Sequence, residues 1–168
     1  MIWIELWDIL DEDGNKTGKI VERGKPMKQD EYHLVVHIWI RNSKGQFLIS
    51  KRTPNKTFPN MWETTGGSAI IGDDSLSAAL REVKEEIGIN LSPTNCRCLF
   101  RLKRQHHHFP DFVDVWLFDE DVDITKVVYQ AEEVCGAMWA TQEQVLAMIE
   151  KGEFVNVFTY LSDLFNLK

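Results

Sequence analysis

Residues 75–87, SLSAALREVKEEI, restrict the possible fold more than any other segment of the chain. On a helical wheel of about 100° per residue, their apolar side chains fall within an arc of roughly 100°, wide enough to pack on a sheet. Asp74 or Ser75 can cap the amino end, and Gly88 suits the left-handed backbone that often follows a helix. The pattern predicts an amphipathic helix whose apolar face consists of Leu76, Ala79, Leu80, Val83 and Ile87.

Three carboxylates, Glu82, Glu85 and Glu86, share a second arc of the same helix. The like-charged pair Glu82 and Glu86 costs roughly 0.2–0.5 kcal/mol in an isolated helix, and Arg81 relieves only part of the repulsion by reaching Glu85. A solvated helix face explains such a run, and so does a bound divalent cation, because carboxylates suit Mg²⁺ or Mn²⁺. Both interpretations predict that the acidic strip is exposed.

The glycines before the helix favour the cation-binding interpretation over that of a solvated helix face. Gly66 and Gly67 stand at the start of the connecting segment, and Gly72 lies just before the helix. Glycine allows sharp turns and a close approach of the backbone to a bound group. A backbone carbonyl is another hard oxygen ligand, so we expect this loop and the helix to form one cation site.

Apolar runs separated by turn residues make up the rest of the chain. Residues 1–30 are typical of an N-terminal β-hairpin, and helices are expected over 141–154, capped by Thr141, and near the C-terminus. Strands flanked by helices favour a single mixed α/β domain over residues 1–168. The remaining predicted strands are 33–40, 46–52, 96–105, 112–120 and 136–139, and the predicted loops are 53–63 and 66–75.

Composition excludes several classes of protein. A chain of 168 residues can bury a core of its own, and its net charge of −7 argues against a nucleic-acid polymer or an anionic membrane as partner. The N-terminal apolar run is short and contains Glu5 and Asp8, so neither a signal peptide nor a membrane span is expected. The three cysteines match no zinc-binding spacing, which favours a reduced, cytoplasmic protein.

Residues 67–89, GSAIIGDDSLSAALREVKEEIGI, resemble the signature of the Nudix (MutT-type) hydrolases. That signature is Gly, five residues, Glu, seven residues, Arg-Glu, an aliphatic residue, any residue, Glu-Glu, any residue, Gly and an aliphatic residue. Asp73 departs from it, because the family has Glu there. The matching positions are Gly67, Arg81, Glu82, Val83, Glu85, Glu86, Gly88 and Ile89.

The resemblance implies an α/β/α sandwich around a mixed sheet and Mg²⁺-dependent hydrolysis of a diphosphate joined to another group, with Mn²⁺ as a possible substitute. By position, Glu82, Glu85, Glu86 and the Gly67 carbonyl would bind metal. Glu82 would also be a candidate base for the attacking water, and Arg81 would orient the carboxylates. Many members use a further acidic residue from a late loop, for which Glu133, or Glu132 beside it, is the candidate.

Two further positions bear on this expectation. Asp73 is one methylene shorter than the family residue, so its ligand or ion pair would be lost or bridged by water, or its role would be structural, near the start of the helix. Arg52, at the end of a predicted strand, is a candidate contact for substrate phosphate.

Residues 5–24 and 31–52 resemble a Nudix subgroup related to isopentenyl-diphosphate isomerase, which leaves an isomerase as an alternative. The isomerase has a catalytic Cys where this chain has Gly66, and its signature lacks the full REVKEE set. A non-catalytic ligand-binding module is a second alternative. The small-molecule diphosphate substrate is not identified by the sequence, and a homodimer edge formed by Trp3 and Trp7 is possible.

Histidines are interpreted as structural. His33 and His37 share one face of a predicted strand and are expected to be packed in the core or at an interface rather than to bind a ligand. The run of three histidines at 106–108 is expected at a solvated hairpin tip.

Overall fold

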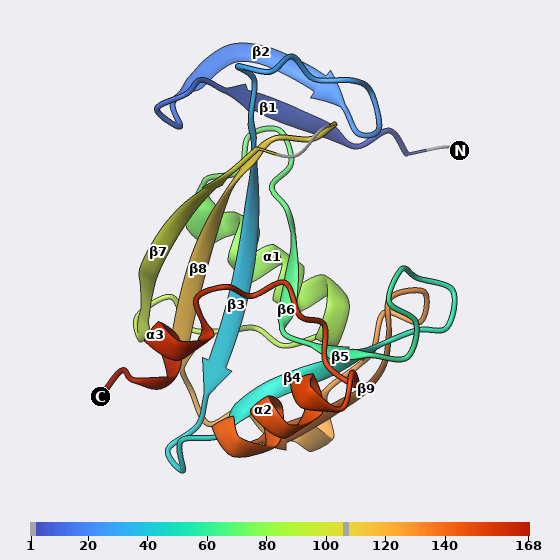
Figure 1. Ribbon diagram of the computed structural model, residues 1–168, viewed down its shortest axis with the longest axis vertical. Coiled ribbons are helices and arrows are strands. Elements are labelled where there is room, and N and C mark those ends of the chain that lie inside the picture. The colour runs from blue at the N-terminus through green and yellow to red at the C-terminus, as the bar shows by residue number, and fades with distance from the viewer. Residues whose placement is uncertain (1–2, 106–107) are drawn as a thin grey trace.

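The computed structural model describes residues 3–105 and 108–168, and it places a small two-stranded sheet beside a larger mixed sheet (Figure 1). The small sheet pairs β1 (Leu6–Leu10) with β2 (Lys16–Glu22), which confirms the N-terminal hairpin. The prediction made for the histidines at 106 and 107 falls outside the described residues. The large sheet contains β3 (His33–Arg41), β4 (Phe47–Arg52), β5 (Trp62–Glu63), β6 (Thr65–Ser68), β7 (Cys96–Arg104), β8 (Asp111–Asp119) and β9 (Val134–Ala140).

Strand β3 is the centre of the large sheet. It runs parallel to β8 along its whole length and antiparallel to β6, while β7 continues the sheet beyond β8. The predicted hairpin between 33–40 and 46–52 is present, but a single pair, Arg41 with Phe47, joins β3 to β4. Strand β4 pairs instead with β5 and β9, so the sheet is divided into two parts that meet at the end of β3.

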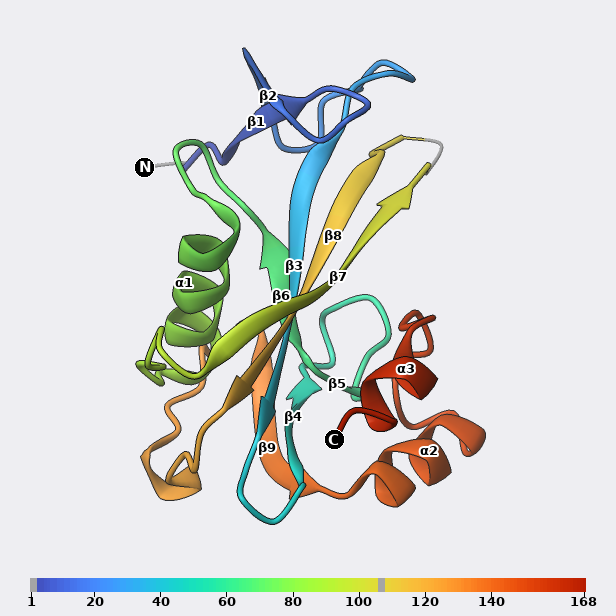
Figure 2. The same cartoon turned by 90° about the vertical axis from the view of Figure 1, so that its left-hand side faces the viewer.

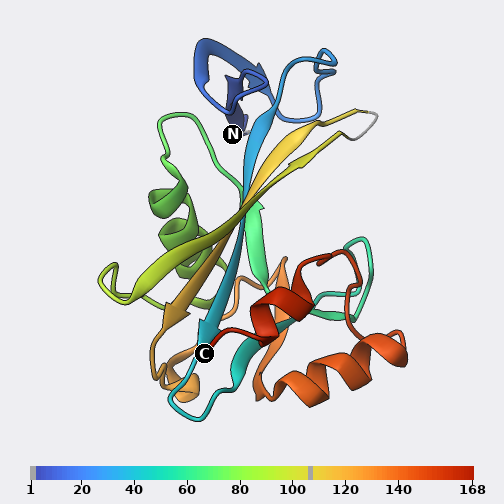
Figure 3. The same cartoon turned by 60° about the vertical axis from the view of Figure 1, so that its left-hand side comes forward.

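Helices cover both faces of the sheet, as Figures 2 and 3 show. Helix α1 (Ser75–Ile87) packs on one face through Ala78, Ala79 and Val83, in a core that includes Ile38. Helices α2 (Gln142–Glu150) and α3 (Leu161–Phe165) pack on the other face, around the fully buried Trp39. This is the expected α/β/α sandwich; a short 3₁₀ helix, η1 (Ile124–Lys126), lies between β8 and β9.

Several predicted boundaries need correction. Residues 62–63 and 66–68, expected to be loop, form β5 and most of β6, because β4 and β3 offer unpaired edges that satisfy their backbone groups. Strand β9 is longer than predicted for the same reason, since it pairs along β4. Helix α2 begins after Thr141 as expected but ends at Glu150, and the C-terminal helix is limited to Leu161–Phe165.

The N-terminal hairpin packs on the main domain through an aromatic contact. The ring of Trp7 stacks on His33 of β3, with ring centroids 3.9 Å apart, and Trp7 is only 4% exposed. Trp7 is therefore part of the interior and not of a dimer edge, whereas Trp3 is 89% exposed, and the homodimer stays a prediction. His33 and His37 are both buried, which confirms that they are core residues.

Candidate active site

Helix α1 is positioned by well-formed ends and a buried apolar face. Asp74 caps its amino end by accepting a hydrogen bond from the Ser77 amide at 2.7 Å, within a capping box. Gly88 follows its carboxyl end in the left-handed conformation, with φ of 70°. Because both ends and the apolar face are fixed, the direction of the acidic arc is fixed as well.

That acidic arc points toward strand β6, which corrects the prediction of an exposed strip. Glu82 is 9% exposed and Glu86 is 8% exposed, while Glu85 lies on the exposed side. The burial arises because residues 65–68 form a strand beside the helix, which the sequence pattern did not indicate. Two of the three carboxylates are thus removed from water, where a charge is costly.

Gly67 and Glu82 are in close contact. A β-carbon at position 67 would lie within 2.6 Å of both Glu82 carboxylate oxygens, so only glycine leaves room for this side chain. Gly67 sits in β6 opposite Val36, and its backbone does not adopt a positive φ. The glycine is therefore required by the carboxylate beside it rather than by a turn.

Burial also changes the proton affinity of the two carboxylates. It raises the pKa of Glu82 to about 7, against the opposing effect of the neighbouring Arg81 guanidinium. Burial, together with repulsion from Glu82 and Glu63, raises the pKa of Glu86 to about 8. At neutral pH both groups therefore hold a proton for much of the time, and a cation that supplied compensating charge would bind with release of that proton.

Arg81 connects Asp73, the residue that differs from the family signature, to the glutamates of helix α1. Its Nε and Nη2 atoms donate to Asp73 Oδ2 at 3.1 and 2.9 Å. Its Nη1 atom donates to Glu82 Oε1 and to Glu85 Oε2, both at 3.1 Å. Despite its shorter side chain, Asp73 makes a direct ion pair with Arg81.

A polar cavity of about 260 Å³ lies over these groups. It brings together the predicted site residues Gly67, Arg81, Glu82, Glu85, Glu86 and Glu133. The cavity is also lined by Glu5, Arg23, Lys56 and Gln130, none of which was singled out from the sequence. Glu133, which is distant in sequence from the acidic helix, thus lines the same cavity as its glutamates.

Two of the missed residues are cations that line the cavity. Lys56, in the loop between β4 and β5, forms an ion pair with Glu133. Arg23, just after β2, forms an ion pair with Glu5 at 3.0 Å. A basic residue in the RTPNKT loop was a usable signal for Lys56, but no sequence pattern relates Arg23 to a helix more than fifty residues later.

Arg52 lies differently from the other predicted site residues. Its Nη1 atom donates to both Glu63 oxygens at 2.9 Å, and its Nε atom donates to the Thr57 carbonyl at 2.6 Å. The structure therefore does not bring Arg52 into the cavity lining, where Lys56 of the same loop region is found.

The donor set fits a hard divalent cation. Carboxylate and carbonyl oxygens are the ligands that Mg²⁺ and Mn²⁺ prefer, and Gly67 leaves space for Glu82 where a β-carbon would exclude it. Across residues 3–105 and 108–168, no three His, Cys, Asp or Glu side chains are already arranged as a metal cluster. Arg81 contacts Oε1 of Glu82 and Oε2 of Glu85, so a cation would be held through the other oxygen of each carboxylate.

The NUDIX domain family model matches residues 31–158, which include β3 to β9 and helix α1. The chain belongs to the Nudix family. A Nudix hydrolase of Listeria monocytogenes is 41% identical over 167 residues, covering 98% of this chain and 96% of the relative. A crystal structure from Deinococcus radiodurans superposes with a TM-score of 0.74 at 27% identity, covering 96% of this chain and 97% of that one.

An isopentenyl-diphosphate Δ-isomerase of Corynebacterium diphtheriae is 25% identical over 167 residues, covering 90% of this chain and 86% of the relative. As a Nudix hydrolase, the protein cleaves diphosphate bonds in small molecules. In the part of the chain that is described, no helix has the length and apolarity to cross a membrane.

Proposed function

We propose that this Nudix protein is a Mg²⁺-dependent hydrolase, with Mn²⁺ as a possible substitute, of a nucleoside-diphosphate-type or related organic diphosphate. The observation that carries the proposal is the burial of Glu86 and of Glu82, the latter beside Gly67, in a cavity that is also lined by basic side chains. Burial makes the charged form of both carboxylates costly, which raises their pKa values, and a bound cation would compensate that charge.

Glu82, Glu85, Glu86 and the Gly67 carbonyl are the residues that would hold the ion. When bound, Mg²⁺ neutralises phosphate charge and lowers the pKa of a coordinated water. Glu82 or Glu133 accepts the proton of the attacking water; both line the same cavity, and the raised pKa of Glu82 suits a base near neutral pH. Arg81 fixes the directions of Glu82 and Glu85.

Substrate phosphate is bound by the basic residues of the cavity. Lys56 and Arg23 project from different loops, and each is paired with a glutamate that a phosphate group would displace. Burial lowers the pKa of Lys56, and the nearby Arg52 charge acts in the same direction, so a dianionic phosphate would favour its charged form. Arg52 itself must leave Glu63 to reach substrate, and we propose that it contacts phosphate only after such a movement.

A hydrolysis screen tests this function. Nucleoside triphosphates, damaged nucleotides, nucleotide sugars, ADP-ribose, dinucleoside polyphosphates and prenyl diphosphates are incubated with Mg²⁺, and release of phosphate or nucleoside monophosphate is measured. We expect at least one substrate whose hydrolysis falls roughly 100-fold or more in Glu85→Gln. The matched control is Glu150→Gln, in helix α2 on the opposite face of the sheet, which should retain wild-type rates.

The same screen separates the alternatives. Isomerised prenyl diphosphate with no release of phosphate would favour the isomerase, although Gly66 stands where that enzyme has its Cys. Binding without turnover of any compound would favour a non-catalytic module.

We further propose that residues 1–168 form one cytoplasmic domain with a hairpin extension over 1–30, and that no nucleic-acid polymer is its substrate.

A further inference from the structure

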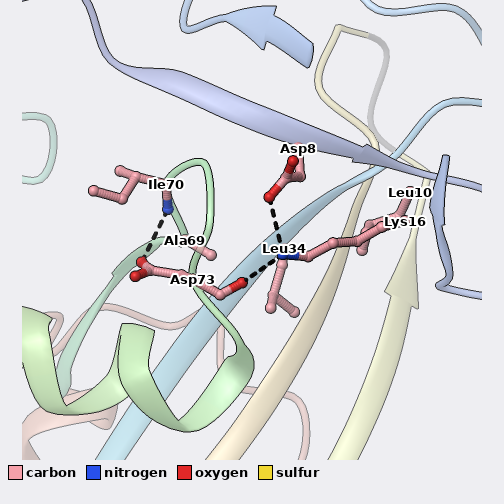
Figure 4. A pocket seen from close by; sticks show the side chains of 7 residues that line it. All are labelled: Asp8, Leu10, Lys16, Leu34, Ala69, Ile70 and Asp73. Atoms are coloured by element: carbon pink, nitrogen blue, oxygen red, sulfur yellow. Dashed lines mark hydrogen bonds and ion pairs between the residues drawn. The ribbon is translucent and has the colours of Figure 1, made fainter. Parts of the chain in front are cut away.

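The N-terminal hairpin holds the loop that precedes helix α1, as Figure 4 shows. Lys16 Nζ donates to the Asp73 carbonyl at 2.9 Å and pairs with Asp8 Oδ2 at 3.0 Å. The same Asp8 oxygen accepts a hydrogen bond from the Gly72 amide at 3.0 Å. The Leu6 carbonyl accepts one from the Ile71 amide at 2.8 Å, so β1 and β2 both bind consecutive residues of this loop.

Little free space remains between the hairpin and the loop. The cavity lined by Leu10, Leu34 and Ala69 has a volume of about 20 Å³, close to that of one water molecule. Apolar side chains of the hairpin, of β3 and of the loop thus line one small cavity beside the polar contacts. The family match begins at residue 31, so the hairpin is an addition to the matched region.

From this loop, the contacts continue to the glutamates. Asp73 Oδ2 accepts hydrogen bonds from the Ile70 amide at 3.1 Å and from Arg81, and Arg81 donates onward to Glu82 and Glu85. Asp73 is shorter than the signature Glu, so its reach to Arg81 depends on where its backbone lies. The hairpin binds that backbone directly, through the Asp73 carbonyl.

We propose that Lys16 and Asp8 are positioning residues for the active site. They fix residues 69–74 so that Asp73 holds Arg81, and Arg81 in turn aligns Glu82 and Glu85. The expected effect on metal binding and activity rests on the proposed function, because those glutamates would bind the cation. Its structural part, the dependence of Arg81 on the hairpin, does not need a cation.

The variants Lys16→Met and Asp8→Asn test the proposal in the full-length protein. Hydrogen exchange at Arg81 Nε–H and at the Gly72 amide is followed by NMR without metal, and Mn²⁺ binding is measured by electron paramagnetic resonance. We expect faster exchange at both positions, Mn²⁺ affinity lowered by about 10-fold, and a lower kcat with an unchanged KM for the substrate found in the screen. Lys16→Arg keeps the positive charge, so it should retain the wild-type values. Lys19→Met, on the same strand, should also match the wild type.

A double variant shows whether Lys16 acts through Asp73. If it does, Lys16→Met adds no further loss of Mn²⁺ affinity in an Asp73→Asn background. Arg81 exchange in Lys16→Met and Asp8→Asn equal to that of Lys19→Met would overturn the proposal. If the proposed function is wrong, the result is different: Glu85→Gln binds Mn²⁺ as well as the wild type does. In that case, the exchange rate at Arg81 still decides the role of the hairpin.

Discussion

At the scale of single residues, the contact between Gly67 and Glu82 leaves no room for a larger side chain. We predict that Gly67→Ala displaces the Glu82 carboxylate, because the new β-carbon would lie within 2.6 Å of its two oxygens. The expected results are a loss of activity on the order of 100-fold and a loss of about 1–3 kcal/mol in the free energy of unfolding. Steady-state kinetics and urea denaturation measure the two effects.

The control for this prediction removes the partner of the clash. In a Glu82→Ala background, Gly67→Ala should cost almost nothing in stability, because no carboxylate remains beside the β-carbon and the backbone at 67 does not require glycine. An equal cost in both backgrounds would show that the glycine serves another purpose.

A second residue-scale prediction concerns pH. The folded-state pKa of Glu86, about 8, lies above the usual value of 4.5, so the folded protein holds this proton more tightly than the unfolded chain. Its contribution to stability is therefore complete below pH 4.5 and is lost as pH rises toward 8, by about 1.4 kcal/mol per pH unit. In chelator, Glu86→Gln should be stabilised relative to wild type at pH 8 but not at pH 4.5.

Denaturation curves of both proteins across this range provide the measurement. The difference between the two proteins isolates Glu86 from other titrating groups, such as His37, whose pKa burial lowers to about 3. A difference in stability that does not change with pH would contradict the prediction.

At the scale of the element, the stability of helix α1 depends on the glycine that follows its carboxyl end. Gly88 and Gly152 have nearly equal φ angles of 70° and 71°, but a β-carbon at 88 would lie 3.0 Å from Val128 Cβ, whereas position 152 has nothing within 4 Å. Both alanine variants suffer the left-handed strain of about 1–2 kcal/mol. Gly88→Ala should therefore lose about 1–3 kcal/mol more than Gly152→Ala in urea denaturation. Equal losses would mean that the segment around Val128 adjusts freely.

At the scale of the whole molecule, cation binding should stabilise the fold. The proposed metal ligands come from β6 and α1, so a bound ion would connect two elements and favour the folded state. Mn²⁺ at about 100 times its dissociation constant should add about 2.7 kcal/mol, and each kcal/mol raises the Tm of a chain of this size by about 2–4 °C. Differential scanning calorimetry should show this increase in wild type and in Glu150→Gln, but not in Glu85→Gln.

Local patterns predicted those parts of the fold that depend on local energetics. The helix over 75–87, a cap at Asp74 or Ser75 and a glycine end follow from spacing and side-chain hydrogen bonding within a few residues, and the structure has the cap at Asp74. The short strands β5 and β6 were missed, because their stability comes from β4 and β3, which are distant in sequence. That omission also caused the incorrect expectation that Glu82 and Glu86 are exposed.

By itself, the sequence determined the amphipathic helix, the acidic cluster upon it and the resemblance to the Nudix signature, because each is encoded within a short stretch of residues. Only the tertiary structure decided which carboxylates are buried, that Glu133 and Lys56 face them, and that Arg52 is held by Glu63. The contact of the N-terminal hairpin with residues 71–73 was likewise decided there. These features depend on strand pairing across long sequence separations, which no local pattern records.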